Sequence, residues 1–258
     1  MKLKQAFYIT IVLLTLMGCE EIAEFYVGMP FQPKNINSEY SPGLNVFGIL
    51  KAGPSYDTLN HFFEVQQLLR LSDTASMEIN EAEIILEQIT GPDSLCIFTL
   101  SNYNAGRYTS SDLNPDFGEQ WNYVCMYDTF IITSSTRIPD QPVLQDGSLA
   151  ATEQSIAFTL QPDTTAFLYE VYYFNESDFA FERILPARDE PTYVDLSIRF
   201  FDPEGNNQLF VFAYDKNYEK YISTSNIFYK PNAYRPRYTT VEGGYGCFCS
   251  AASIKLEL

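Results

Sequence analysis

The sequence predicts an all-β protein built of two β-sandwich domains. The first observation is an aromatic content of 16%, which comes from 19 Tyr and 20 Phe with a single Trp. Tyr and Phe suit pleated, half-buried surfaces and are enriched in strands. The second observation is that short apolar runs alternate with turn residues from Leu44 onward. This pattern is typical of many short strands joined by turns.

Residues 1–18 have the pattern of a secretory signal peptide. Lys2 and Lys4 form a basic start, and residues 6–17 are apolar apart from two threonines. The stretch is shorter than the roughly 20 residues that a membrane-spanning helix needs. Its end, Leu16-Met17-Gly18-Cys19, resembles the lipobox of a bacterial lipoprotein, which implies cleavage before Cys19 and acylation of that cysteine. The alternative is an ordinary signal peptide followed by an incidental cysteine.

Residues 19–43 are expected to form an acidic, polar tether between the lipid anchor and the first strand. Glu20, Glu21 and Glu24 are similar to the acidic export tags on surface lipoproteins of Bacteroidota, although a solvated acidic linker has the same composition. Removal of residues 1–18 takes two lysines from a chain of net charge −17, which leaves −19. A surface this acidic repels nucleic acid, so a DNA- or RNA-binding role is disfavoured.

Residues 44–137 are expected to form the N-terminal β-sandwich. The predicted strands are the apolar runs 44–50, 62–71, 82–89, 95–100 and 121–134. The run 82–89 also contains good helix formers, and periodicity alone cannot decide so short a segment. The turn residues 90–93 that follow it, Thr-Gly-Pro-Asp, favour a strand.

Residues 138–154 hold two prolines and few bulky side chains, so we expect an interdomain linker there. A C-terminal β-sandwich is predicted for residues 155–258, with an immunoglobulin- or fibronectin-III-like arrangement. Its predicted strands are 155–160, 166–174, 179–185, 192–201, 207–222 and a last strand, 253–258. Within 207–222, the strand prediction places Tyr214, Tyr218 and Lys220 on one face.

Four cysteines follow Cys19, and four cysteines permit three disulfide pairings. Export to an oxidising compartment allows disulfides. We expect a bond between Cys96 and Cys125, because both lie in strand-like segments of the same region. No zinc site is expected, because no C-x-x-C spacing occurs and His61, the single histidine, is remote in sequence from all four cysteines.

Several stretches together resemble a known family of lipoproteins: "LNVFGILKAG" (44–53), "INEAEIIL" (79–86), "GRYTSSDLNPDFGEQWNYVC" (106–125), "TRIP" (136–139) and "TTVEGGYGCFCSAAS" (239–253). The family is domain of unknown function 4249, and the first half is also similar to carboxypeptidase-regulatory-like, prealbumin-type sandwiches. Cys247 and Cys249 depart from the family's closing motif, which has an aliphatic residue and a glycine at these positions. The resemblance implies an outer-membrane lipoprotein of Bacteroidota, often encoded beside SusC-like TonB-dependent transporters, with no established enzymatic activity.

The glycine-rich stretch "VEGGYG" (241–246) has two interpretations. It lacks the Lys-Ser/Thr that a phosphate-binding loop requires, so its glycines are expected to permit positive φ in a tight loop before the last strand. The alternative is a partner-contact loop made of Glu242, Gly243, Gly244, Tyr245 and Phe248, in which the two rings anchor a partner.

No catalytic motif stands out in the sequence. A catalytic triad would have to use His61, and no G-x-S-x-G string is present. Carboxylate pairs such as Glu81 with Glu83 arise by coincidence among 33 acidic residues. We therefore expect no cofactor, no bound metal and a binding role: an accessory subunit of a SusC-like uptake system, held at the outer membrane by its lipid anchor and facing the cell surface. A freestanding adhesin or a glycan- or peptide-binding lipoprotein is the alternative.

Overall fold

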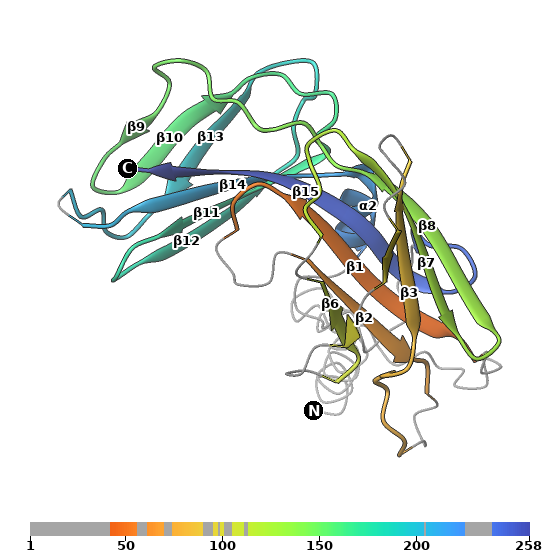
Figure 1. The fold of residues 1–258 in the computed structure, drawn as a ribbon. Helices are drawn as coiled ribbons and strands as arrows, with labels where there is room; N and C mark the ends of the chain where they lie inside the picture. Colours follow the sequence, from red (N-terminus) through yellow and green to blue (C-terminus); the bar gives the residue numbers. More distant parts are fainter. Residues whose placement is uncertain are drawn as a thin grey trace, which may run out of the picture. The chain divides into compact units, whose positions relative to one another are not determined.

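The computed structural model describes residues 42–55, 61–69, 74–89, 95–97, 99–100, 105–110, 113–203, 205–224 and 239–258. They all belong to one compact unit, which comprises residues 42–225 and 231–258. The predicted signal peptide, Cys19 and nearly all of the predicted tether lie outside the described residues. Within the described part, three β-sheets and one short helix make up the chain (Figure 1), so the prediction of an all-β sandwich fold is confirmed.

The largest sheet has eight strands in the order β12-β11-β14-β15-β1-β2-β6-β5. In chain order its strands are β1 (Leu44–Ala52), β2 (Phe62–Gln67), β5 (Thr99–Leu100), β6 (Arg107–Thr109), β11 (Leu168–Phe174), β12 (Phe179–Ile184), β14 (Gln208–Tyr214) and β15 (Tyr245–Glu257). All neighbouring strands are antiparallel except β1 and β15, which are parallel.

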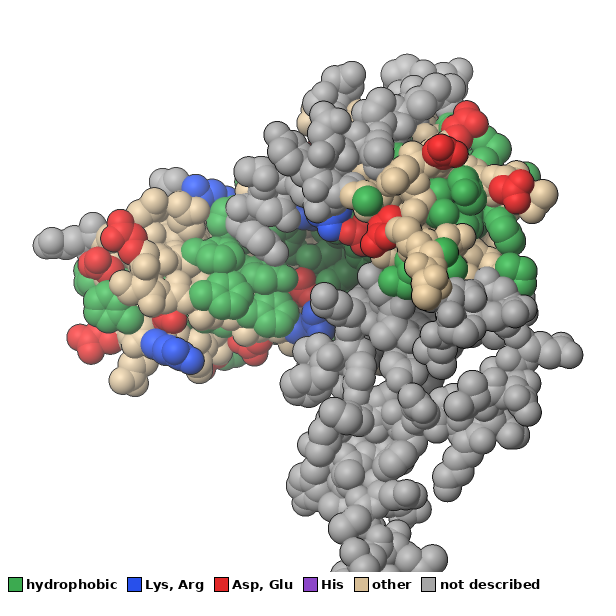
Figure 2. All heavy atoms as spheres, turned by 90° about the horizontal axis from the view of Figure 1, so that it is seen from below, with side chains coloured by type: hydrophobic (Ala, Val, Ile, Leu, Met, Phe, Trp, Pro, Cys, Tyr) green, Lys and Arg blue, Asp and Glu red, His purple; other side chains and the backbone are tan. Residues whose placement is uncertain are grey.

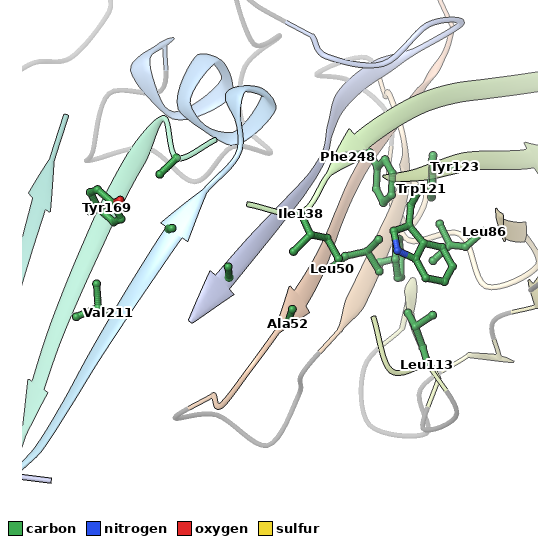
Figure 3. Close-up of a cluster of buried hydrophobic side chains, with 14 of the residues drawn as sticks. Leu50, Ala52, Leu86, Leu113, Trp121, Tyr123, Ile138, Tyr169, Val211 and Phe248 are labelled. Atoms are coloured by element: carbon green, nitrogen blue, oxygen red, sulfur yellow. The ribbon is translucent and has the colours of Figure 1, made fainter. Parts of the chain in front are cut away.

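The first sandwich is closed by a four-stranded sheet of order β4-β3-β7-β8. Its strands are β3 (Glu83–Gln88), β4 (Leu95–Ile97), β7 (Gln120–Tyr127) and β8 (Phe130–Arg137). Aromatic rings from both sheets meet in the core: Tyr123 of β7 stacks on Phe248 of β15 at 4.9 Å and on Phe63 of β2 at 5.7 Å. Figure 3 shows Phe248 beside Tyr123 in this core.

The second sandwich is closed by a three-stranded sheet of order β13-β10-β9. Its strands are β9 (Ala150–Ala151), β10 (Ser155–Leu160) and β13 (Thr192–Ser197). In β10 and β13 alternate residues are buried, so each strand presents one apolar face to the core. These residues join one continuous core cluster with the inner faces of β11 and β14.

Strand β15 belongs to both sandwiches, which corrects the predicted division into domains 44–137 and 155–258. Residues 245–252 pair with β1 of the first sandwich, and residues 251–257 pair with β14 of the second. The last strand therefore begins at Tyr245 and not at residue 253 as predicted. Residues 138–154, predicted as a linker, lie between β8 and β10 in the chain, and β9 and a bridge between Leu144 and Leu160 pair part of them with β10.

Two predicted strands are divided in the structure. The run 95–100 supplies β4 to one sheet and β5 to another, so the chain changes layers within it. The run 121–134 is a hairpin of β7 and β8 that turns at residues 128–129, where Asp128 has a φ of 53°. Asp is one of the few residues with a side chain that tolerate this left-handed conformation, so the turn has a local cause.

The prediction of one strand over 207–222 is wrong beyond Tyr214, because residues Lys216–Thr224 form helix α2. Asp215 caps the helix: its carboxylate accepts a hydrogen bond from the backbone N–H of Tyr218 at 2.9 Å. Tyr214, Tyr218, Tyr221 and Ile222 follow a helical spacing and pack in one apolar cluster. No helix among the described residues is long and apolar enough to cross a membrane.

Candidate functional site

A layer of aromatic rings lies on the outer face of the eight-stranded sheet, over β11, β12 and β14. The strand register places Tyr172 opposite both Phe181 and Phe210, and Phe174 opposite Phe179. Neighbouring ring centroids are 4.9–6.3 Å apart. We call this layer the aromatic face; it consists of Tyr172, Phe174, Phe179, Phe181, Phe210 and Phe212.

The aromatic face is buried at its base and exposed at its rim. Phe210 and Phe212 are only 3% and 1% exposed, whereas Phe179 and Phe181 on β12 are 57% and 42% exposed. Figure 2 shows hydrophobic side chains, several of them rings, gathered at the surface on the side that carries β11 and β12. Contiguous exposed apolar surface is unfavourable in water and marks interaction sites in monomeric proteins.

A buried carboxylate borders the aromatic face. Glu170 of β11 is 1% exposed, and its Oε1 accepts hydrogen bonds of 2.9 Å and 2.6 Å from Nε and Nη2 of Arg183. The hydroxyl of Tyr172 donates to its other oxygen at 2.7 Å, and that of Tyr218 on α2 donates to Oε1 at 3.3 Å. Burial lowers the pKa of Arg183, but the hydrogen bond and charge of Glu170 outweigh burial and raise that pKa. The pair thus holds the guanidinium in place, 5.5 Å from the centroid of the Phe181 ring.

A second buried carboxylate, Asp215, lies where β14 meets α2. Thr136 of β8 donates its hydroxyl proton to Asp215, and the hydroxyl oxygens of Thr136 and Ser250 are 2.7 Å apart. Burial raises the pKa of Asp215 to about 6, against the opposing effect of its hydrogen bonds. No cation pairs with Asp215 among the described residues. Through its hydrogen bonds this carboxylate caps α2 and links it to β8 and β15.

Two of the three glycines of the stretch have the positive φ that the first interpretation predicts, and Gly244 does not. Gly243 and Gly246 have φ angles of 80° and 113°. A Cβ atom on Gly243 would collide with the carbonyl oxygen of Ile131, and one on Gly246 with that of Val46. Both residues must therefore be glycine, Gly243 where the loop packs against β8 and Gly246 where β15 pairs with β1.

The partner-contact interpretation of this loop is wrong for Phe248, which is fully buried against Tyr123. Glu242 and Gly243 are exposed, and Gly244 and Tyr245 are half-buried. The backbone of Glu242 exchanges two hydrogen bonds with Thr133, at 2.8 Å and 3.0 Å, so its main chain closes the first sandwich.

The expected disulfide between Cys96 and Cys125 is not formed. Cys125 is a buried free thiol, and β3 lies between its strand, β7, and the strand of Cys96, β4. Two strand spacings are about 9.6 Å, well beyond the Cα–Cα distance of about 7 Å that a disulfide tolerates. Cys247 and Cys249 are also buried free thiols on β15.

His61 is a structural residue. It is buried, and its Nδ1 accepts a hydrogen bond from the backbone N–H of Lys51 at 3.1 Å. Burial and, to a smaller extent, the charge of Lys51 lower its pKa to about 4. Glu81 and Glu83 are exposed. Among the described residues, no group of three or more His, Cys, Asp or Glu could hold a metal ion.

Sequence reasoning missed the aromatic face because aromatic residues occur on both sides of β11. Tyr169 and Tyr173 point into the core, whereas Tyr172 and Phe174 point outward. The one available signal was the alternation in "FAFER" (179–183), which places Phe179 and Phe181 on the same side as Arg183.

Comparisons with known proteins give no family. No protein-family model matches the chain, and no curated protein matches it. Among solved structures, the chain is similar to the FN1–FN3 domains of chicken CNTN1, with 13% identity and a TM-score of 0.24; the match covers 83% of this chain and 66% of that one. It is also similar to the chicken interferon gamma receptor alpha chain, with 12% identity and a TM-score of 0.20 over 67% of this chain and 88% of that one. Likenesses this weak add nothing to the sheet topology described above.

Proposed function

We propose that this protein is a lipid-anchored binding protein of the outer membrane, facing the cell surface, which acts as an accessory subunit of a SusC-like, TonB-dependent uptake system and has no catalytic role. The anchor is proposed from the lipobox that ends at Cys19, and the transport partner from the resemblance in residues 44–53 and 239–253. The binding surface is proposed from the aromatic face.

The exposure of Phe179 and Phe181 is the observation that carries the binding role. Aromatic side chains and arginine are enriched in protein interfaces, where a few of them supply most of the binding energy. Both rings stand on a β-strand beside Arg183, whose position Glu170 holds. Little ordering entropy is therefore lost when a partner covers them.

The side chains best suited to catalysis are poorly placed for it. His61 is buried and neutral at pH 7, because its pKa is lowered to about 4. Burial raises the pKa of the Cys125 thiol to about 11, so it is protonated at neutral pH. These placements support a binding role over a hydrolytic one.

Purification from native membranes in mild detergent tests the proposal. A transporter of the SusC-like class should co-purify with the wild type and with Tyr193→Ser, an exposed ring on the other sheet. It should be lost with the double variant Phe179→Ser, Phe181→Ser. Cys19→Ser should release the protein from the membrane. Recovery of the wild type without any transporter under several growth conditions would contradict the transport role.

A freestanding glycan- or peptide-binding protein is the second candidate, because flat, exposed rings also stack on sugar rings. The mature chain alone would then bind a glycan or peptide array with micromolar affinity. The same double variant should lose this binding, whereas Tyr193→Ser should retain it.

A further inference from the structure

The strand β12 forms an open edge of the eight-stranded sheet. Among the described strands, its one neighbour in the sheet is β11. Natural proteins protect such edges with charged side chains, proline, bulges or a covering segment. The sequence of β12, "FAFERI", contains no Pro or Gly; its charged residues are Glu182 and Arg183, the latter bonded to Glu170, and two of its rings are exposed. This edge is therefore suited to pairing with another strand.

The backbone of β12 offers the required hydrogen-bonding groups. The hairpin between β11 and β12 is closed by a hydrogen bond of 3.1 Å from the N–H of Asn175 to the carbonyl of Asp178. Hydrogen-bonded pairs alternate along antiparallel strands, so Ala180 and Glu182 bond to β11. The backbone groups of Phe179, Phe181 and Arg183 then point away from β11, toward the open edge. The N–H of Phe179 agrees with this direction, because it donates to the side chain of Asp178 at 2.9 Å. This N–H must leave Asp178 before it can bond to a second strand.

We propose that a second copy of this chain pairs with β12, antiparallel, about a two-fold axis at Phe181. In this register Phe181 lies opposite Phe181 of the second copy. Phe179 lies opposite Arg183 of the second copy, and Arg183 opposite its Phe179. Ala180 lies opposite Glu182, so no two like charges are directly opposed. The outward-pointing backbone groups of both strands coincide at these positions, which is the condition for a regular ladder.

The side chains of this strand complement themselves. Phe179 and Phe181 are the exposed rings of β12, and the pairing brings both against side chains of the second copy at their edges. Arg183 is held by Glu170 within 5.5 Å of the Phe181 ring, so its guanidinium is already placed for a cation–π contact with Phe179 of the second copy. In this register Phe181 pairs with Phe181 of the second copy, and Phe179 pairs with its Arg183. The same five residues therefore supply both halves of the contact, which favours a second copy as the partner.

Charge sets the conditions for this dimer. Two mature chains, each of net charge −19 after removal of residues 1–18, repel each other at long range. At physiological ionic strength this repulsion is screened beyond about 8 Å. At the paired edge itself, the side chains that meet are rings and arginines. The dimer uses the edge of the sheet and leaves the outward sides of the rings accessible, so it joins two aromatic faces side by side. It goes beyond the proposed function and does not depend on it.

Substitution of Phe181, the residue at the two-fold axis, by residues of opposite charge tests the proposal. The purified mature chain is used, without any transporter present. Phe181→Glu and Phe181→Lys each place like charges opposite each other, so each variant alone should be monomeric by sedimentation equilibrium. An equimolar mixture should form a heterodimer at least about tenfold more tightly than either variant self-associates. Rescue on mixing separates the pairing from a fold defect, because misfolded chains would not recover.

Cross-linking tests the register. Cα atoms of a hydrogen-bonded antiparallel pair are about 5.5 Å apart, within disulfide range. Mild oxidation of Phe181→Cys should therefore give a covalent dimer, whereas Tyr193→Cys, at a more exposed position on the three-stranded sheet, should stay monomeric. A monomeric wild type at every concentration, or equal cross-linking of the two variants, would overturn the proposal. So would cross-linking of Phe181→Cys in cells to a different protein only. Apart from that last result, none of these outcomes bears on whether a transporter co-purifies.

Discussion

Replacement of Asp215 by Asn is expected to stabilise the protein at neutral pH and to leave it unchanged in acid. Burial disfavours the charged form of Asp215, although the hydrogen bonds that it accepts from Thr136 and from the backbone N–H of Tyr218 favour that form. The amide of Asn carries no charge at any pH and keeps an oxygen that accepts from the Tyr218 N–H, so the substitution removes the cost of burying a charge.

The magnitude follows from the pKa of Asp215, which burial raises from 3.8 to about 6. A gap of roughly two units at 1.36 kcal/mol per unit corresponds to about 3 kcal/mol. The pKa of Asp215 is higher in the folded protein than in the unfolded chain. The stability that its protonated carboxyl contributes is therefore fully present below about pH 4. It is lost as pH rises through about 6. Asn is as good a helix cap as Asp, so α2 keeps its hydrogen bond from Tyr218.

Urea unfolding between pH 4 and pH 7.5 measures this effect, with the fluorescence of Trp121 as the signal, since Trp121 is the single tryptophan and is buried. The wild-type curve alone is insufficient, because His61 titrates over the same range with the opposite sign. The difference between Asp215→Asn and the wild type removes the contribution of His61, which both proteins contain. This difference should rise from near zero at pH 4 to between about 1 and 3 kcal/mol at pH 7.5.

A difference that stays constant with pH would refute the reasoning, as would an Asn variant less stable than the wild type at pH 7.5. Asp215→Ala is the matched control. It removes the cap of α2 and leaves the Tyr218 N–H without its acceptor, so it should destabilise the protein by about 1–2 kcal/mol at low pH.

Three further predictions concern the core, the glycine-rich loop and the buried histidine. Phe248→Ala should lower the free energy of unfolding by about 3–5 kcal/mol in urea titrations, because it opens a cavity beside Tyr123; a loss below about 1 kcal/mol would contradict the stacked core. Gly246→Ala should cost more than Gly147→Ala in the same measurement, because both positions have positive φ but only at Gly246 would a Cβ meet backbone; equal losses would contradict this. The pKa of His61 is lowered to about 4, so its contribution to stability is lost as pH falls from 6.5 toward 4. His61→Gln should therefore gain stability relative to the wild type over this range, and a difference that does not change with pH would argue against burial of the neutral ring.

The positions of most strands were predictable from the sequence. Apolar–polar alternation in residues 155–160 and 192–197 identified β10 and β13, and both have the predicted buried face. The helix α2 was missed because Asp215 directly continues the apolar run of β14, although the spacing of Tyr214, Tyr218 and Tyr221 is helical. The structural role of the glycines in "VEGGYG" was predicted, because positive φ is a local property of the backbone.

The composition and the turn residues by themselves determined an all-β chain with strands near their observed positions, since propensity and alternation act over a few residues. Only the tertiary structure decided which strands are neighbours. β1 and β15 lie about 200 residues apart in sequence and pair in parallel, and β3 separates Cys96 from Cys125. It also decided that Phe248 is buried while Phe179 is exposed. The physical reason is that alternation assigns side chains to two faces, but only the packing of a second layer determines which face water reaches.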